Sequence, residues 1–272
     1  MMGLSVLILA VGSDVKGRGG LDGYPFLAAE MSGMVLMERI IRQCEALSPE
    51  TITCMLGADD IDEYHLDSIV KLSSPGVSII RVEAPTAGAA CTGLLASDVI
   101  DNERELLIVN ANNFVESGFR RSIDFFRSWR LPPSEGDLQA NGGIITFDSI
   151  HPRYSSVRVS GDRSDCHEAY KHFVEEVSEK NPISRNASVG VYWFRRGVDY
   201  IDACKEMIRK DVRVDGQFFV SMAYNEIILE NGIVVSHKID RDSYFPIKTP
   251  REVLALQNHF AHRAARGGYA GR

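Results

Sequence analysis

The chain has 272 residues, of which 44% are hydrophobic and 25% charged, and its net charge is −7 with a pI near 5.5. This composition is that of a globular protein with a sizeable core, and the acidic balance argues against the basic face of a nucleic-acid-binding protein. A local basic pocket for a phosphorylated ligand remains compatible with it.

The five cysteines show no metal-ligand spacing, which favours reduced thiols. No apolar run approaches the roughly 18 residues of a membrane span, and the N-terminus has no basic segment or cleavage site of a secretion signal. We therefore expect a cytoplasmic protein that binds neither nucleic acid nor a membrane. The oligomeric state is left open, with a homo-oligomer as one option.

Short apolar runs alternate with helical periodicity through the first half of the chain. They predict strands over residues 6–11, 51–56, 77–82 and 106–109, with helices over 34–47, 60–72, 87–97 and 117–130. This alternation favours an α/β fold of Rossmann-like type, with a mostly parallel central sheet and helices on both faces. Ligands bind at the carboxyl ends of such strands, so the turns after Val11 and Val109 should share one cleft.

A proline-containing break over residues 131–137 precedes a more β-rich second half. The patterns predict strands over 142–147, 156–160, 173–177, 189–194 and 233–237, and helices over 197–210, 217–230 and 250–262. Residues 263–272 read as a disordered tail. The whole therefore reads as one domain over residues 1–262.

A glycine-rich loop from Gly12 to Pro25 follows the first strand and precedes a helix. Backbone amides of such a loop favour contact with phosphate groups, although a flexible turn is the alternative. Lys16 supplies positive charge in the loop, but Phe26, which follows Pro25, has none and is expected to be a packing residue.

Several further motifs follow along the chain, and their order and spacing are informative as a set although each motif alone is weak. They are the small-residue segment Thr86–Thr92, the segment Val109–Glu116, Gly142-Gly143, Glu179-Lys180, Val189–Phe194 and Val214–Val220. In order and spacing they resemble the sugar-1-phosphate nucleotidyltransferases, in particular the branch found in surface-polysaccharide gene clusters, over about residues 4 to 258. The resemblance implies a nucleotide-binding half over 1–131 and a smaller β-rich sugar-side half over 138–262.

The resemblance also implies roles for individual residues. Nucleotide contacts are expected at Ala10, Val11, Gly12, Ser13, Asp14, Thr86, Gly88, Ala89 and Asn110. Substrate contacts are expected at Asn112, Gly143, Glu179 and Gly190, and Lys16 and Lys180 are expected to meet phosphates as catalytic residues. Mg²⁺ would be the cofactor of a catalytic protein, with Asn112 as a ligand.

The catalytic motifs depart from the family pattern. Asp14 occupies the position of a family glycine, Lys16 that of the catalytic arginine, and Phe26 that of a lysine. Asn112 and Pro246 stand where the family has its metal-binding carboxylates, which leaves Asp14, Glu116, Asp215, Asp240 and Asp242 as possible substitutes. Met34 also stands where the family has the lysine of a Gly-Lys-Pro. The two lost lysines and one lost metal carboxylate, at about 2 kcal/mol each, would slow phosphoryl transfer by roughly four orders of magnitude if they acted independently.

Two functions follow from this pattern. The first is a nucleotidyltransferase of weak or altered activity, which joins a nucleoside monophosphate from a triphosphate to a sugar phosphate or similar metabolite. The second is a non-catalytic protein that binds a nucleotide or nucleotide-sugar in the same cleft, as a sensor or as a partner of an active enzyme. A glycosyltransferase is a weaker third reading, because Asn110-Ala-Asn112 lacks an Asp-x-Asp.

Overall fold

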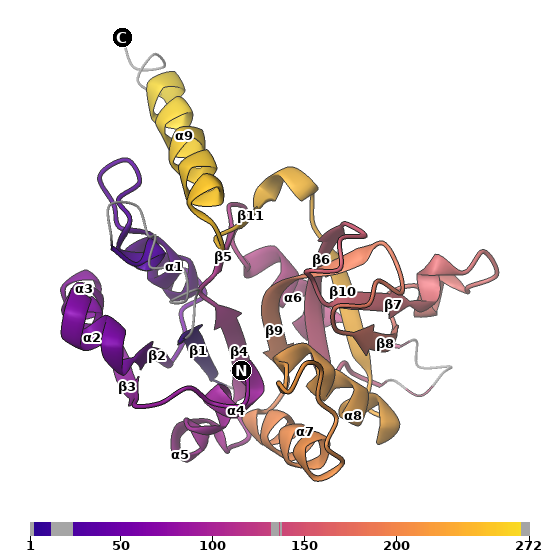
Figure 1. The fold of residues 1–272 in the computed structure, drawn as a ribbon. Helices are drawn as coiled ribbons and strands as arrows, with labels where there is room; N and C mark the ends of the chain where they lie inside the picture. Colours follow the sequence, from indigo (N-terminus) through magenta and orange to yellow (C-terminus); the bar gives the residue numbers. More distant parts are fainter. Residues whose placement is uncertain (1–2, 12–23, 132–135, 137, 268–272) are drawn as a thin grey trace.

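The structure is a computed structural model that describes residues 3–11, 24–131, 136 and 138–267. Its centre is a nine-stranded sheet whose main path has the order β10-β6-β9-β4-β1-β2-β3 (Figure 1). The strands are β1 (Leu4–Ala10), β2 (Thr51–Gly57), β3 (Ser78–Val82), β4 (Glu105–Asn110), β6 (Gly142–Asp148), β7 (Ser156–Val159), β8 (Val174–Ser178), β9 (Asn186–Phe194) and β10 (Val234–Lys238).

Most strands of the main path run in the same direction. β1 pairs in parallel with β2 and β4, and β10 pairs in parallel with β6. β9 is antiparallel to both of its neighbours, β4 and β6, so it joins two groups of parallel strands. β7 and β8 form an antiparallel pair at the amino-terminal end of β9.

Helices cover both faces of this sheet. They are α1 (Leu36–Glu45), α2 (Ala58–Tyr64), α3 (Leu66–Ser73), α4 (Ala89–Leu94), α5 (Ser97–Ile100), α6 (Arg120–Ser128), α7 (Gly197–Arg209), α8 (Ala223–Leu229) and α9 (Pro250–Gly267). Side chains alternate across β1, so Val6 and Ile8 pack in a core with α1, α3 and α6, whereas Leu7 and Leu9 pack in a second core with α4, α7 and α8. The predicted α/β architecture is confirmed.

Several helix predictions are wrong in their limits. The helix expected over 87–97 is divided into α4, which ends at Leu94, and α5, which begins at Ser97. The helix expected over 60–72 is divided into α2 and α3 at His65, whose φ is +53°. The helix expected over 217–230 begins as α8 at Ala223, because Val214 and Gln217 form a β-bridge with left-handed backbone at Asp215 and Gly216.

The last helix is longer than predicted. α9 continues past His262 to Gly267, so residues 263–267 of the expected disordered tail are helical. Arg263 bonds to Glu116 from this extension, which ties the helix to the segment after β4. Among the helices of the described segments, none combines the length and the apolar character that a bilayer crossing requires.

A second, two-stranded sheet was not predicted. β5 (Asn113–Val115) pairs antiparallel with β11 (Tyr244–Pro246), and the Ile247 amide donates to the Asn112 carbonyl at 2.8 Å. This pairing brings the chain before α9 beside the turn that follows β4.

Candidate functional site

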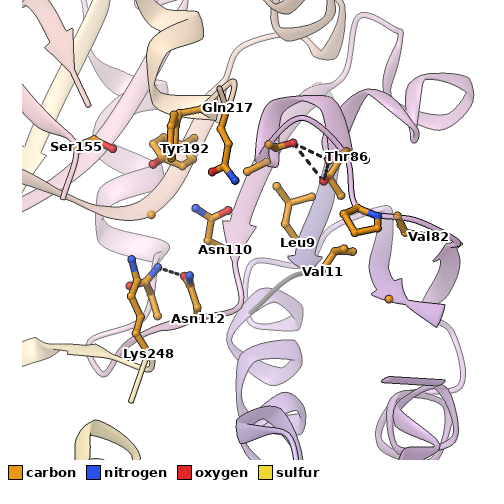
Figure 2. A pocket seen from close by; sticks show the side chains of 18 of the residues that line it. Leu9, Val11, Val82, Thr86, Asn110, Asn112, Ser155, Tyr192, Gln217 and Lys248 are labelled. Carbon is orange, nitrogen blue, oxygen red and sulfur yellow. Dashed lines mark hydrogen bonds between the residues drawn. The ribbon is translucent and has the colours of Figure 1, made fainter. Parts of the chain in front are cut away.

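A cavity of about 680 Å³ opens at the carboxyl ends of β1, β2, β3 and β4 (Figure 2). Val11, after β1, and Asn110, at the end of β4, both line it. The prediction that these two strand ends share one cleft is therefore confirmed. The volume lies in the range of pockets that enclose small-molecule ligands.

One wall of the cavity is the loop that leads into α4. The Thr86 hydroxyl donates to the Gly88 carbonyl at 2.9 Å and lies 2.7 Å from the Thr92 hydroxyl. Gly88 has a φ of +117°, and a Cβ there would lie 2.5 Å from the carbonyl oxygen of Phe218. The missing side chain lets this loop contact the chain at Phe218, and the neighbouring Gln217 lines the same cavity.

The floor of the cavity is made of asparagine side chains. A Cβ on Gly190, whose φ is +81°, would lie 2.5 Å from Nδ2 of Asn113 and 3.4 Å from Nδ2 of Asn110. Gly190 therefore gives these two amides the space that they occupy. Asn113 in turn donates to Oδ1 of Asn112 at 2.5 Å and accepts a hydrogen bond from the Tyr244 hydroxyl at 2.5 Å.

A buried carboxyl group forms part of the wall opposite the Thr86 loop. Oε2 of Glu179 accepts hydrogen bonds from Ser155 at 2.5 Å and from Ser221 at 3.2 Å. Burial raises the pKa of Glu179 above its usual range, and the two hydroxyls and the charges of Lys248 and Lys180 oppose that shift. The cavity thus presents a buried, hydrogen-bonding carboxyl group, which suits recognition of hydroxyl groups.

Two cations that the sequence analysis did not single out also line the cavity. Arg153 donates to Oε1 of Glu252 at 2.7 Å, and Oε2 of the same carboxylate accepts the Lys248 backbone amide at 2.9 Å. Glu252 lies in the first turn of α9, where a carboxylate is favoured by the helix dipole. It therefore anchors both cationic residues at one side of the cavity. The pairing of β5 with β11 brings Lys248 and Glu252 to this side of the cavity, and neither short strand has a clear sequence pattern.

The structure brings together eight of the residues expected from the resemblance. They are Val11, Thr86, Gly88, Ala89, Asn110, Asn112, Glu179 and Gly190. The expected residues Gly12, Ser13, Asp14 and Lys16 lie outside the described residues.

Three other expected residues are not placed at the cavity wall. Ala10 is fully buried and faces the core on the α1 side, because side chains alternate along β1. Gly143 packs against Phe126, which a Cβ there would approach to 2.4 Å, so this glycine makes room for the core rather than for a ligand. Lys180 lies beyond Glu179 and forms an ion pair with Asp215 at 2.7 Å.

Among the residues that the structure describes, the side chains around Asn112 do not fit a magnesium ion. Mg²⁺ prefers carboxylate oxygens, but Oδ1 of Asn112 already accepts from Asn113, and Pro246 has no side-chain donor. Glu116, one of the possible substitutes, is bonded to His259 at 2.8 Å and to Arg263. No group of three or more His, Cys, Asp or Glu side chains suited to a metal occurs within the described segments.

An acidic edge lies at the other end of the cavity, where Asp59, Asp60 and Glu83 follow β2 and β3. Burial, and then the neighbouring Asp59 and Glu63 carboxylates, raise the pKa of Asp60 from 3.8 to about 6. A raised carboxyl pKa means that the folded state holds the proton more tightly than the unfolded chain, so stability is lost as pH rises from about 4 to above 6.

Replacing Asp60 by asparagine is expected to remove this loss. Asp60→Asn should stabilise the fold by about 2 kcal/mol at pH 8, with a smaller gain at pH 5, as urea unfolding would show. Asp202→Asn changes an exposed carboxylate of α7 and should have no such pH dependence. An equal effect of Asp60→Asn at both pH values would contradict the assignment.

Comparison with solved structures gives the fold a context. A nucleoside-diphosphate-sugar pyrophosphorylase from Vibrio cholerae superposes with a TM-score of 0.68 at 19% identity, over 94% of this chain and 99% of that one. A putative glucose-1-phosphate thymidylyltransferase from Bacillus anthracis has a TM-score of 0.66 at 15% identity, over 96% and 95% of the two chains. HddC from Yersinia pseudotuberculosis has a TM-score of 0.61 at 16% identity, over 96% and 100%.

These likenesses show a nucleotidyltransferase-like fold along nearly the whole chain. At such low identity they show the fold alone. No model of a known protein family matches the sequence.

Proposed function

We propose that the cavity binds a nucleoside triphosphate or a nucleotide-sugar together with a small phosphorylated sugar or similar metabolite. The observation that carries this proposal is the meeting of the β1 and β4 ends with the Thr86 loop on one side and Glu179 on the other, in one cavity. The loop offers closely approachable backbone for a flat base, and the buried carboxyl of Glu179 accepts hydroxyl donors. Two of the similar structures are a nucleoside-diphosphate-sugar pyrophosphorylase and a putative glucose-1-phosphate thymidylyltransferase, which supports the same ligand class.

We further propose that the protein transfers a nucleoside monophosphate to the sugar phosphate, with weak or altered activity. Phosphoryl transfer needs fixed positive charge at the phosphates, which Lys248, together with Arg153 in its ion pair with Glu252, supplies in part. A role in surface-polysaccharide synthesis rests on the sequence resemblance.

The second candidate is a binding protein without turnover. The specific observation in its favour is the amide rather than carboxylate character of the side chains after β4, where Asn112 and Asn113 bond to each other. Such a protein would hold the same ligand in the same cavity.

One experiment separates these functions. Thermal shift with a panel of nucleoside triphosphates and nucleotide-sugars, with and without Mg²⁺, would find ligands, and pyrophosphate release would then be measured with sugar 1-phosphates. A bound ligand raises the free energy of unfolding by an amount that grows with the ratio of its concentration to Kd. At a hundredfold excess over Kd the increase should be about 3 kcal/mol. Binding with release supports the transferase, and binding without release supports the second candidate. No shift with any member of the panel would contradict both.

A further inference from the structure

Lys248 lines the cavity on the side of Asn112, where the sequence resemblance implies a metal-binding residue. Lys248 follows Pro246 by two residues, and Pro246 pairs with Asn113 across the small β5–β11 sheet. The amide of Ile247 donates to the carbonyl of Asn112, so the segment is fixed against the turn after β4. Figure 2 shows Lys248 on the same side of the cavity as Asn112, and away from Thr86 and Val82.

The backbone of Lys248 is held in place by hydrogen bonding, so the position from which its side chain extends is fixed. The amide of Lys248 donates to Glu252 at 2.9 Å, and Val253 of the same helix turn is fully buried in the core. The side chain of Lys248 is half-buried at the cavity wall. A lysine on a fixed backbone keeps its ammonium group within a limited region of the cavity.

Charged groups of both signs lie near Lys248. Arg153 lies beside Lys248 through their shared partner Glu252. Glu179 is the other carboxyl group nearby, and its oxygen Oε2 is already bonded to the hydroxyls of Ser155 and Ser221. The asparagine amides of the floor add polar groups without net charge.

We propose that the ammonium group of Lys248 takes the place of a divalent cation at the phosphates of the ligand, so that phosphate binding in this cavity does not require a metal. A lysine next to phosphate oxygens makes charge-assisted hydrogen bonds and neutralises one negative charge. This inference rests on the proposed function and specifies how its phosphates are held.

Calorimetric titration in EDTA and in millimolar Mg²⁺ tests the inference. The probes are UDP-glucose, dTDP-glucose, GDP-mannose and inorganic pyrophosphate. We expect at least one probe to bind, with Kd values in the two conditions within about threefold of each other. Lys248→Gln is expected to weaken binding about tenfold or more in EDTA, and Lys248→Arg, which keeps the charge, to weaken it less.

Control variants keep the outcomes distinct. Lys205→Gln removes the same charge from an exposed ion pair on α7, 3.7 Å from Asp202, and should leave Kd unchanged. The melting temperature of each variant shows whether it is folded, and the comparison of Kd in EDTA and in Mg²⁺ on the parent chain remains the test if the glutamine variant is not. Binding that requires Mg²⁺, or an unchanged Kd in folded Lys248→Gln, would overturn this inference and leave the proposed function intact. Absence of binding by every probe in both conditions would overturn both.

Discussion

Replacing Gly88 by alanine is expected to destabilise the protein by about 3–4 kcal/mol. The residue has a φ of +117°, and a Cβ would lie 2.5 Å from the carbonyl oxygen and 2.7 Å from the amide nitrogen of Phe218. The strained backbone costs about 1–3 kcal/mol, and the clash is with main chain, which cannot rotate away.

Relief of that clash would break hydrogen bonds. The amide of Phe218 donates to the Ala87 carbonyl at 2.7 Å, and the amide of Ala90 donates to the Phe218 carbonyl at 3.1 Å. Each lost bond adds about 1 kcal/mol. Since both segments line the cavity, Gly88→Ala should also weaken ligand binding.

Urea unfolding measures this effect, and Gly216→Ala is the matched control. Gly216 also has a positive φ, +75°, but a Cβ there would meet nothing within 4 Å. Its substitution should cost only the backbone term, about 1 kcal/mol. Equal losses for the two variants would show that the contact with Phe218 does not matter.

Replacing Phe26 by lysine is expected to destabilise the fold rather than to restore activity. The sequence resemblance places a catalytic lysine at this position, which makes the substitution an obvious trial. In the structure, however, Phe26 is only 9% exposed and belongs to the hydrophobic core that also contains α1. The expectation that it is a packing residue is confirmed.

The expected loss for Phe26→Lys is about 3 kcal/mol or more. Truncation of a buried phenylalanine typically costs about 3–5 kcal/mol, and a lysine recovers part of this by extending its ammonium group to water. For a chain of this size the melting temperature should fall by roughly 6–10 °C.

Calorimetry or a thermal shift would show this fall. Phe26→Leu, which keeps an apolar side chain, should lose about 1 kcal/mol. A Phe26→Lys variant that melts like the parent chain and gains pyrophosphate release would contradict the core assignment.

The sequence predicted the sheet because its strands carry strong local signals. Residues 6–11 and 106–109 are continuous apolar runs, which are typical of strands buried on both faces. Their order relative to the helices sufficed to place Val11 and Asn110 at one cleft. The break at His65 has no such signal, because a left-handed residue other than glycine depends on its surroundings.

The cationic side of the cavity could not be predicted in the same way. β5 and β11 have three residues each, and Pro246 within β11 argues against a strand when only the sequence is considered. Their pairing joins positions more than a hundred residues apart, which no local pattern encodes. The positions of Lys248 and Arg153 at the cavity are therefore visible only in the structure. Gly143 and Ala10, which were expected to contact ligands, instead pack in the core.

The most direct test of the account is a crystal structure of the protein with the nucleotide-sugar that gives the largest thermal shift. The account predicts a ligand in the cavity at the ends of β1 and β4, with its base against the loop of Thr86 and Gly88 and its phosphates within hydrogen-bond reach of Lys248. A ligand bound at another surface, or in this cavity with its phosphates away from Lys248 and held by a metal ion, would contradict it.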